Sequence, residues 1–125
     1  MDNTYNPVGW FEIPTTDMNR AKKFYEAVFE VELTPATVEQ VEMAWFPSIE
    51  DGIGASGTLI KSEALTPSHE GILIYFTAPD IDGTLAKVNA NGGKTLTPKT
   101  SIGEYGFYAY FEDSEGNRLG LHSTA

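Results

Sequence analysis

The feature that most constrains the fold of this chain is an internal repeat of 63 residues. The tripeptide Leu-Thr-Pro occurs at residues 33–35 and again at 96–98. The same shift, without any gap, aligns three further pairs: Asp17 with Asp80, Trp45 with Tyr108, and Gly57 with Gly120. Matches at one fixed offset are typical of duplicated structural units. We therefore predict one domain over residues 1–125 that contains two similar modules, at about 6–62 and 69–125.

The first module has the pattern of one strand, one helix and three further strands. Residues 8–14 have the β-rich composition of a strand, and Asp17 provides a helix N-cap. A helix that ends near residue 29 or 30 is predicted by apolar residues at three- and four-residue steps: Met18, Ala21, Tyr25 and Val28. Short strands are expected at 31–34, 41–46 and 54–61, with a turn-rich segment at 47–52.

The second module repeats this order. Residues 71–78 are strand-like, and Asp80 precedes a second helical pattern, formed by Ile81, Leu85 and Val88. The sequence Asn-Gly-Gly at 91–93 is a strong helix stop. Strands are expected near 94–96, 106–112 and 117–122. The two modules together predict an α+β fold built from tandem βαβββ units.

Composition excludes several classes of function. The formal net charge is -10, so the field of the protein repels phosphate backbones and we expect no nucleic-acid partner. The absence of cysteine removes disulfides, thiolate metal ligands and thiol nucleophiles. The chain has neither an apolar run long enough for a membrane span nor a signal-peptide pattern at its start. We therefore expect a cytoplasmic protein without a membrane partner.

Two segments carry a resemblance to a known family. The helix motif Asp-x-x-x-Ala-x-x-Phe-Tyr lies within residues 10–29, and the sequence Phe-Glu-Asp-Ser-Glu-Gly-Asn-Arg-Leu-Gly-Leu-His occupies residues 111–122. In this order they resemble the vicinal oxygen chelate superfamily, which includes glyoxalase I, extradiol dioxygenases, fosfomycin-resistance enzymes and bleomycin-resistance proteins. The resemblance implies that two βαβββ modules form a cupped mixed sheet around a ligand. It also implies that a second copy often completes the cup, so we expect a homodimer.

The resemblance further implies four positions at which metal-dependent members carry their ligands. In this chain these positions are Trp10, Gly57, Leu73 and Gly120. An indole, an isobutyl group and two hydrogens supply no nitrogen or oxygen donor of the kind that a catalytic divalent ion needs. We therefore expect no cofactor, and a divalent metal would have to bind at other positions.

Period-2 alternation along the strands predicts which polar side chains share the inner face. It places Glu12 beside Trp10, Tyr75 beside Leu73, and His122 beside Gly120. The opposite face then carries apolar residues toward the helices: Phe11, Ile13, Ile72, Ile74, Phe76, Leu119 and Leu121. Glu12 and His122 are candidates for a proton-transferring pair, and the alternative is that both are hydrogen-bonded but idle.

Aromatic residues give the predicted cup its binding character. Five aromatic residues lie on strands that should edge the cavity, where they suit a flat or cationic organic ligand: Trp10, Trp45, Tyr75, Tyr108 and Tyr110. For Trp45 and Tyr110 a place in the core is the equal alternative. Gly57 and Gly120 would leave room beside the aromatic side chains. The leading hypothesis is a metal-independent small-molecule binder, similar to the bleomycin-resistance proteins. The alternatives are a glyoxalase I-like lyase, an isomerase or a dioxygenase that uses Glu12 and His122 or a displaced metal, and a dimeric interaction module without a ligand.

Overall fold

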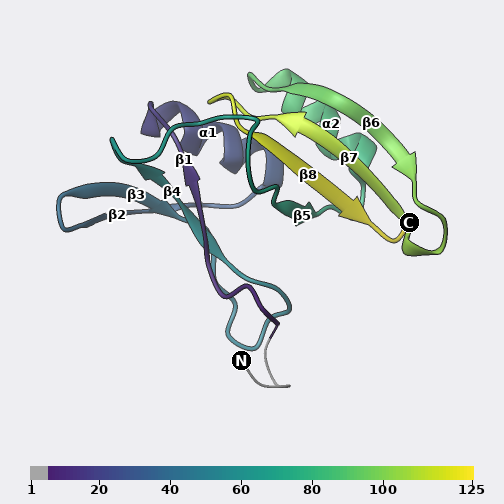
Figure 1. Ribbon diagram of the computed structural model, residues 1–125, viewed down its shortest axis with the longest axis horizontal. Coiled ribbons are helices and arrows are strands. Elements are labelled where there is room, and N and C mark those ends of the chain that lie inside the picture. The colour runs from purple at the N-terminus through teal and green to yellow at the C-terminus, as the bar shows by residue number, and fades with distance from the viewer. Residues whose placement is uncertain (1–5) are drawn as a thin grey trace.

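The computed structural model describes residues 6–125 and has the expected α+β fold of two βαβββ modules (Figure 1). The first module contains β1 (Phe11–Pro14), α1 (Met18–Phe29), β2 (Thr34–Val38), β3 (Val41–Trp45) and β4 (Gly57–Lys61). The second contains β5 (Tyr75–Thr77), α2 (Ile81–Ala90), β6 (Lys94–Ser101), the short 3-10 helix η1 (Gly103–Tyr105), β7 (Phe107–Glu112) and β8 (Arg118–Ser123).

Each module forms its own four-stranded mixed sheet. The strand orders are β1-β4-β3-β2 and β5-β8-β7-β6, and the first and last strands of each module are parallel neighbours. The two helices lie next to each other, and the sheets diverge on either side of them (Figure 1). The cup is therefore divided between two separate sheets and is not one continuous sheet.

Both helices begin at the predicted aspartates. Asp17 Oδ1 accepts a hydrogen bond from Arg20 N at 3.0 Å, and Asp80 Oδ1 accepts one from Gly83 N at 3.1 Å. Each contact satisfies an N-terminal amide that has no partner inside the helix. Within residues 6–125, neither these helices nor any other is long and apolar enough to cross a membrane.

A single aromatic cluster joins the two modules. Phe29 of α1 stacks on Phe76 of β5 with ring centroids 4.5 Å apart, and Phe11 meets Phe76 edge-on at 5.8 Å. Tyr25 is fully buried in the same cluster. Aromatic contacts of this geometry add to the free energy gained from burial alone. The two modules therefore share one hydrophobic core.

Two predictions about the strands are wrong in detail. The strand expected at 31–34 begins only at Thr34, because Leu33 is buried and its amide is bonded to Glu26 Oε2 at 2.9 Å. Ile72, which the alternation places in the core, is 94% exposed. The reason is that β5 begins at Tyr75, so the alternation of a strand does not extend back to residue 72.

The pairing of strands also corrects the 63-residue alignment in its later part. Thr34 pairs with Trp45 in the first module, and Thr97 pairs with Tyr110 in the second, so Tyr110 is the structural counterpart of Trp45. The β6 strand contains irregularities between Thr95 and Thr100, which lengthen the hairpin that follows. The sequence match of Trp45 with Tyr108 is therefore not a structural equivalence.

The last strands of the two modules, β4 and β8, are offset from the 63-residue alignment by one residue in the opposite direction. Glu12 pairs with Thr58, whereas its counterpart Tyr75 pairs with Gly120. Thr58 is therefore the counterpart of Gly120, and Gly57 is not. A Cβ at Gly57 would meet the carbonyl oxygen and ring of Phe11, which packs against the core. Gly57 therefore lies on the core-facing side of the first sheet, in close contact with Phe11, and not on the inner face.

The turn between β7 and β8 connects the second module to the first. Asp113 is almost fully buried and accepts hydrogen bonds from Tyr25 Oη at 2.6 Å and from Asn117 Nδ2 at 3.0 Å. Asn117 Nδ2 also donates to the Pro14 carbonyl at 2.8 Å. Burial raises the pKa of Asp113, although these hydrogen bonds act in the opposite direction.

Glu115 makes a second connection from the same turn. Its carboxylate accepts hydrogen bonds from Arg20 Nε at 2.6 Å and from Thr15 Oγ1 at 2.7 Å. Burial alone would raise its pKa, but the hydrogen bonds from Arg20 and Thr15 outweigh burial and lower the pKa to about 2. The turn therefore holds a charged carboxylate against the beginning of α1.

Candidate functional site

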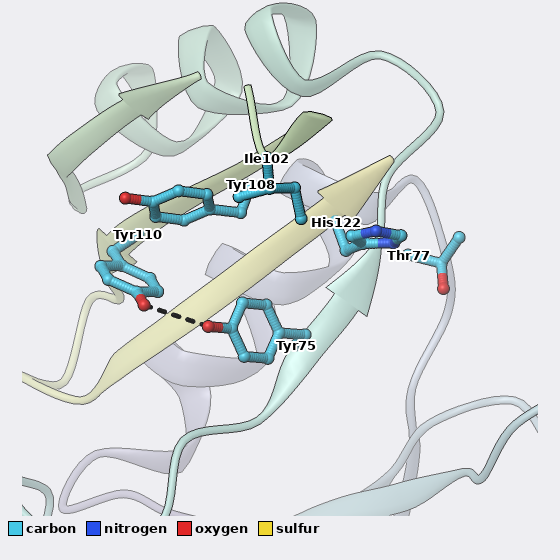
Figure 2. Close-up of a pocket in the computed structure, with 6 residues that line it drawn as sticks. All are labelled: Tyr75, Thr77, Ile102, Tyr108, Tyr110 and His122. Atoms are coloured by element: carbon cyan, nitrogen blue, oxygen red, sulfur yellow. Dashed lines mark hydrogen bonds between the residues drawn. The ribbon is translucent and has the colours of Figure 1, made fainter. Parts of the chain in front are cut away.

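A hollow lies on the inner face of the second sheet (Figure 2). It is an open pocket of about 490 Å³. Six side chains from β5, β7, β8 and the turn after β6 line it: Tyr75, Thr77, Ile102, Tyr108, Tyr110 and His122. Its size is within the range of small-molecule sites.

Gly120 allows two of the tyrosines to meet across β8. Tyr75 on one side and Tyr110 on the other are both paired with Gly120. A Cβ at this glycine would overlap the Tyr75 ring, so the absence of a side chain leaves the space that the ring occupies. The hydroxyl groups of Tyr75 and Tyr110 are hydrogen-bonded at 3.0 Å, as the dashed line in Figure 2 shows.

This hydrogen bond determines what the two hydroxyls offer to a ligand. One tyrosine donates its proton to the other, and the accepting tyrosine retains its own proton for a further partner. The hydrogen bond with Tyr110, followed by burial, raises the pKa of Tyr75 to about 12. Tyr75 is therefore a neutral phenol at physiological pH, and the pair presents a hydrogen-bond donor and aromatic surface.

Tyr108 extends the aromatic surface toward His122. The rings of Tyr108 and Tyr110 are 5.1 Å apart between centroids and inclined at 55°, and Tyr108 pairs with His122 on the next strand. Figure 2 shows Tyr110 and His122 at opposite ends of the group, with Tyr75 and Tyr108 between them. A planar ligand would meet several ring faces or edges at once.

Within residues 6–125, one ring nitrogen of His122 is hydrogen-bonded and the other is not. Nε2 lies 2.8 Å from the Tyr105 carbonyl oxygen, which can only accept, so Nε2 carries a proton. In the neutral imidazole Nδ1 is then an acceptor, and no hydrogen bond to it is found within residues 6–125. The pocket therefore has an acceptor at one end and a phenol donor at the other.

Three of the predicted site residues line this pocket, and Gly120 lies beneath it. The three are Tyr75, Tyr108 and His122. Glu12 is exposed on β1 and does not line the pocket, and no hydrogen bond or ion pair joins it to His122 in the described part of the chain. The described chain thus shows no direct contact between the two residues of the hypothetical proton-transferring pair.

The remaining predicted residues lie on the first module or before β5. Trp10 and Trp45 meet edge-on with centroids 6.5 Å apart, and both are about half exposed. The indole of Trp45 also contacts the sulfur of Met43 at 3.5 Å. Leu73 is half-buried in the segment that precedes β5. Trp10 and Trp45 form a second aromatic surface, and neither lines the tyrosine pocket.

Sequence reasoning left three pocket residues out of the predicted site. Thr77 lies two residues after Tyr75, so the same period-2 argument identifies it. Tyr110 was among the aromatic residues expected on strands at the edge of the cavity, but the sequence did not decide between a place in the core and one in the site. Ile102 follows the irregular β6 and carries no sequence signal of a pocket residue.

The residues do not fit the metal centre that the family resemblance implies. Trp10, Leu73 and Gly120 have no donor atom in their side chains, and Gly57 faces the core. Thr58, the structural counterpart of Gly120, is fully buried and its hydroxyl is bonded to backbone carbonyls. Across residues 6–125, no three His, Asp or Glu side chains gather in a group that could hold a metal ion.

The fold and this cup-lining site define a class, and the sequence assigns the chain to it. Residues 8–121 match the Glyoxalase/Bleomycin resistance protein/Dioxygenase superfamily, to which the chain therefore belongs. A glyoxylase-like domain-containing protein from Didymella fabae is 32% identical over 117 residues, which cover 90% of each chain. The protein CFP32 from Mycobacterium tuberculosis is 27% identical over 122 residues, but the match spans only 43% of that longer relative.

Solved structures with low sequence identity share the fold. A glyoxalase/bleomycin resistance protein from Albidiferax ferrireducens superposes with a TM-score of 0.71 at 20% identity, covering 94% of this chain and 98% of that one. TnmS3, an antibiotic binding protein from a Streptomyces species, superposes with a TM-score of 0.67 at 21% identity, covering 99% and 100%. The fold of this chain thus also occurs in an antibiotic binding protein.

Proposed function

We propose that this glyoxalase-like protein is a metal-independent binder of a small aromatic molecule. The observation that carries the proposal is the pocket of three tyrosines, in which Tyr75, Tyr108 and Tyr110 surround an open space beside His122. Tyrosine provides a large, rigid contact area and a polar end at little cost in conformational entropy. A flat organic molecule is the ligand that best matches these surfaces.

The polar groups of the pocket favour binding over chemistry. The hydroxyl of the Tyr75–Tyr110 pair that accepts from the other can donate a hydrogen bond to a ligand, and the Nδ1 atom of His122 can accept one. Glu12, the partner that an acid–base mechanism would require, does not line the pocket. The antibiotic-binding function of TnmS3 on a similar fold is consistent with this proposal.

We further propose that the protein is a homodimer. Large apolar side chains are exposed where β1 begins, β3 ends and the loop to β4 runs: Val8, Trp10, Trp45, Ile49 and Ile53. An exposed apolar patch of this kind often marks an interaction site. A second copy of the chain would cover this surface. Dimerisation is also the most direct way for Trp10 and Trp45, which do not line the pocket of their own chain, to take part in a binding site.

A ligand screen with metal analysis tests the binding proposal. Thermal-shift measurements with planar aromatic compounds should identify stabilising ligands, since a ligand that binds the folded state raises stability by RT ln(1 + [L]/Kd). Tyr110→Ala should remove the shift, whereas Val38→Ala, which alters an exposed apolar side chain on β2 outside the pocket, should retain it. Stoichiometric metal that survives dialysis, or shifts unaffected by Tyr110→Ala, would contradict the proposal.

A further inference from the structure

Arg118 is a cationic side chain adjoining the tyrosine pocket. It lies two residues before Gly120 and four before His122 on β8, so its side chain projects from the same face of the sheet. Its guanidinium carbon is 5.9 Å from the centre of the Tyr110 ring. It is also close enough to Tyr75 to oppose the rise of that pKa. Arg118 thus lies next to the Tyr75–Tyr110 pair at the edge of the pocket and is not one of the six residues that line it.

One nitrogen of the Arg118 guanidinium, Nε, has no hydrogen-bond acceptor among residues 6–125. This Nε is the one buried side-chain nitrogen or oxygen within residues 6–125 that lacks a hydrogen-bond partner. Glu112, the residue opposite Arg118 on β7, is already bonded to His69 Nε2 at 2.8 Å and lies 3.6 Å from Lys94 Nζ. A buried donor without a partner costs free energy, and each such group in a native protein calls for an explanation.

Arginine at such a position is suited to recognising oxygen anions. Its planar fork of N–H donors binds carboxylates in a bidentate manner, and it stacks on aromatic rings while doing so. The contact of Arg118 with Tyr110 leaves the guanidinium oriented by a ring that itself lines the pocket. A ligand that lies on the tyrosines would bring any acidic group at its edge toward Arg118.

We propose that Arg118 binds a negatively charged oxygen of the ligand, so that the pocket selects aromatic acids over aromatic cations. The inference rests on the proposed binding function and specifies its ligand class. The net charge of -10 favours cations at long range, but that field is largely screened beyond about 8–10 Å at physiological salt. A direct contact with a guanidinium is screened much less.

Three probes with one ring system and different charges test the inference. Anthracene carboxylate, anthracene methanol and aminomethyl anthracene are titrated into the protein at neutral pH and about 0.15 M salt, with fluorescence anisotropy as the readout. We expect the carboxylate to bind at least about tenfold more tightly than the ammonium, which is the effect of one charged hydrogen bond. The neutral alcohol should fall between them.

Variants separate a contact of Arg118 from an effect of net charge. Arg118→Gln should abolish the preference for the carboxylate. It should leave the affinity for the alcohol within about twofold of that of the unaltered protein. Arg118→Lys should retain part of the preference, which guards against a folding defect in the first variant. Lys23→Gln removes the same charge from an exposed position on α1 and should change nothing.

The outcomes distinguish the two proposals. If none of the three probes binds the unaltered protein, the aromatic binding function is refuted and the inference fails with it. If all three bind equally, if the ammonium binds best, or if Arg118→Gln keeps the preference for the carboxylate, the aromatic pocket stands and the role of Arg118 is refuted.

Discussion

The hydroxyl of Tyr25 in α1 donates a 2.6 Å hydrogen bond to the buried carboxylate of Asp113 in the β7–β8 turn. This contact joins residues 88 positions apart and connects the two modules. Asp113 also accepts from the backbone amides of Glu115 and Asn117 at 2.9 Å, so the turn is organised around it. The position of β8, and with it Gly120 and His122, therefore depends on a contact with the first module.

Removing the Tyr25 hydroxyl should destabilise the whole domain. We expect Tyr25→Phe to lower the free energy of unfolding by about 1–3 kcal/mol, because Asp113 would lose one of its hydrogen bonds while staying buried. Urea denaturation followed by circular dichroism measures this difference. Tyr105→Phe, at an exposed tyrosine, should stay within about 0.5 kcal/mol. Equal effects of the two variants would mean that the contact between the modules does not stabilise the fold.

Acid should weaken the second connection between the modules. The pKa of Glu115 is about 2 in the folded protein against an ordinary value of 4.5, so the folded state favours its charged form. Its contribution to stability is complete above pH 4.5 and is lost as the pH falls toward about 2. The raised pKa of Asp113 has the opposite sign, because its protonation favours the folded state.

A variant at Glu115 isolates its contribution from that of Asp113. Glu115→Gln should be less stable than the unaltered protein at pH 7, and the difference between the two should shrink as the pH is lowered below 4.5. The measurement is the urea midpoint at a series of pH values. A difference that stays constant over the whole range would show that the charge of Glu115 is not what stabilises the connection.

The two glycines that the sequence aligned should respond differently to alanine. At Gly57 a Cβ would meet the Phe11 backbone and ring, and the backbone cannot move aside, so Gly57→Ala should cost about 1–3 kcal/mol of stability through overpacking. At Gly120 the obstacle is the half-exposed Tyr75 ring, which can rotate away. Gly120→Ala should therefore weaken ligand binding more than it weakens the fold.

Denaturation and ligand titration of both glycine variants distinguish these effects. Gly57→Ala should retain the ligand affinity of the folded protein, because Gly57 is not part of the pocket lining. If Gly57→Ala loses binding while Gly120→Ala keeps it, the structural assignment of the inner face is wrong.

The exposed apolar surface of the first module gives a prediction about assembly. A stable homodimer buries roughly 800 Å² on each partner, and an introduced charge at its centre would oppose association. Trp45→Glu should therefore shift the protein from dimer to monomer in analytical ultracentrifugation. Lys23→Glu, a charge change on the outer face of α1, should leave the dimer intact. A monomeric unaltered protein would refute the proposed dimer.

Local signals predicted the helices and the early part of each module well. Asp17 and Asp80 cap the helices as their sequence context indicates, and Thr34 and Thr97 occupy equivalent positions at the repeat distance. These elements lie close to the start of each module, where no insertion separates them. For these elements the gap-free 63-residue alignment therefore pairs structurally equivalent residues.

The later strands and the site could not be predicted in the same way. The hairpins of the two modules differ in length, so Ala44 and Ala109 are equivalent although they stand 65 residues apart. Leu59 and Leu121, which pair with them, stand only 62 apart. One residue of slip exchanges the two faces of a strand. Gly57 was assigned to the inner face for this reason.

Contacts over long sequence distances determined the rest. Neither the buried Tyr25–Asp113 pair nor the Arg118 Nε without a partner among residues 6–125 has a signature in a single sequence, because each depends on which neighbours the fold brings close. Tyr75 and His122 were found because both lie on regular strands, where alternation specifies the face.

The central claim is that the tyrosine pocket binds an aromatic ligand without a metal ion. The most direct test is a titration of the chelator-treated protein with anthracene methanol, repeated with Tyr110→Ala and after addition of divalent metal. We predict saturable binding by the metal-stripped protein, no gain on adding metal, and a loss of at least about tenfold in affinity in Tyr110→Ala. Binding that appears only when metal is restored, or that is unchanged in Tyr110→Ala, would contradict the claim.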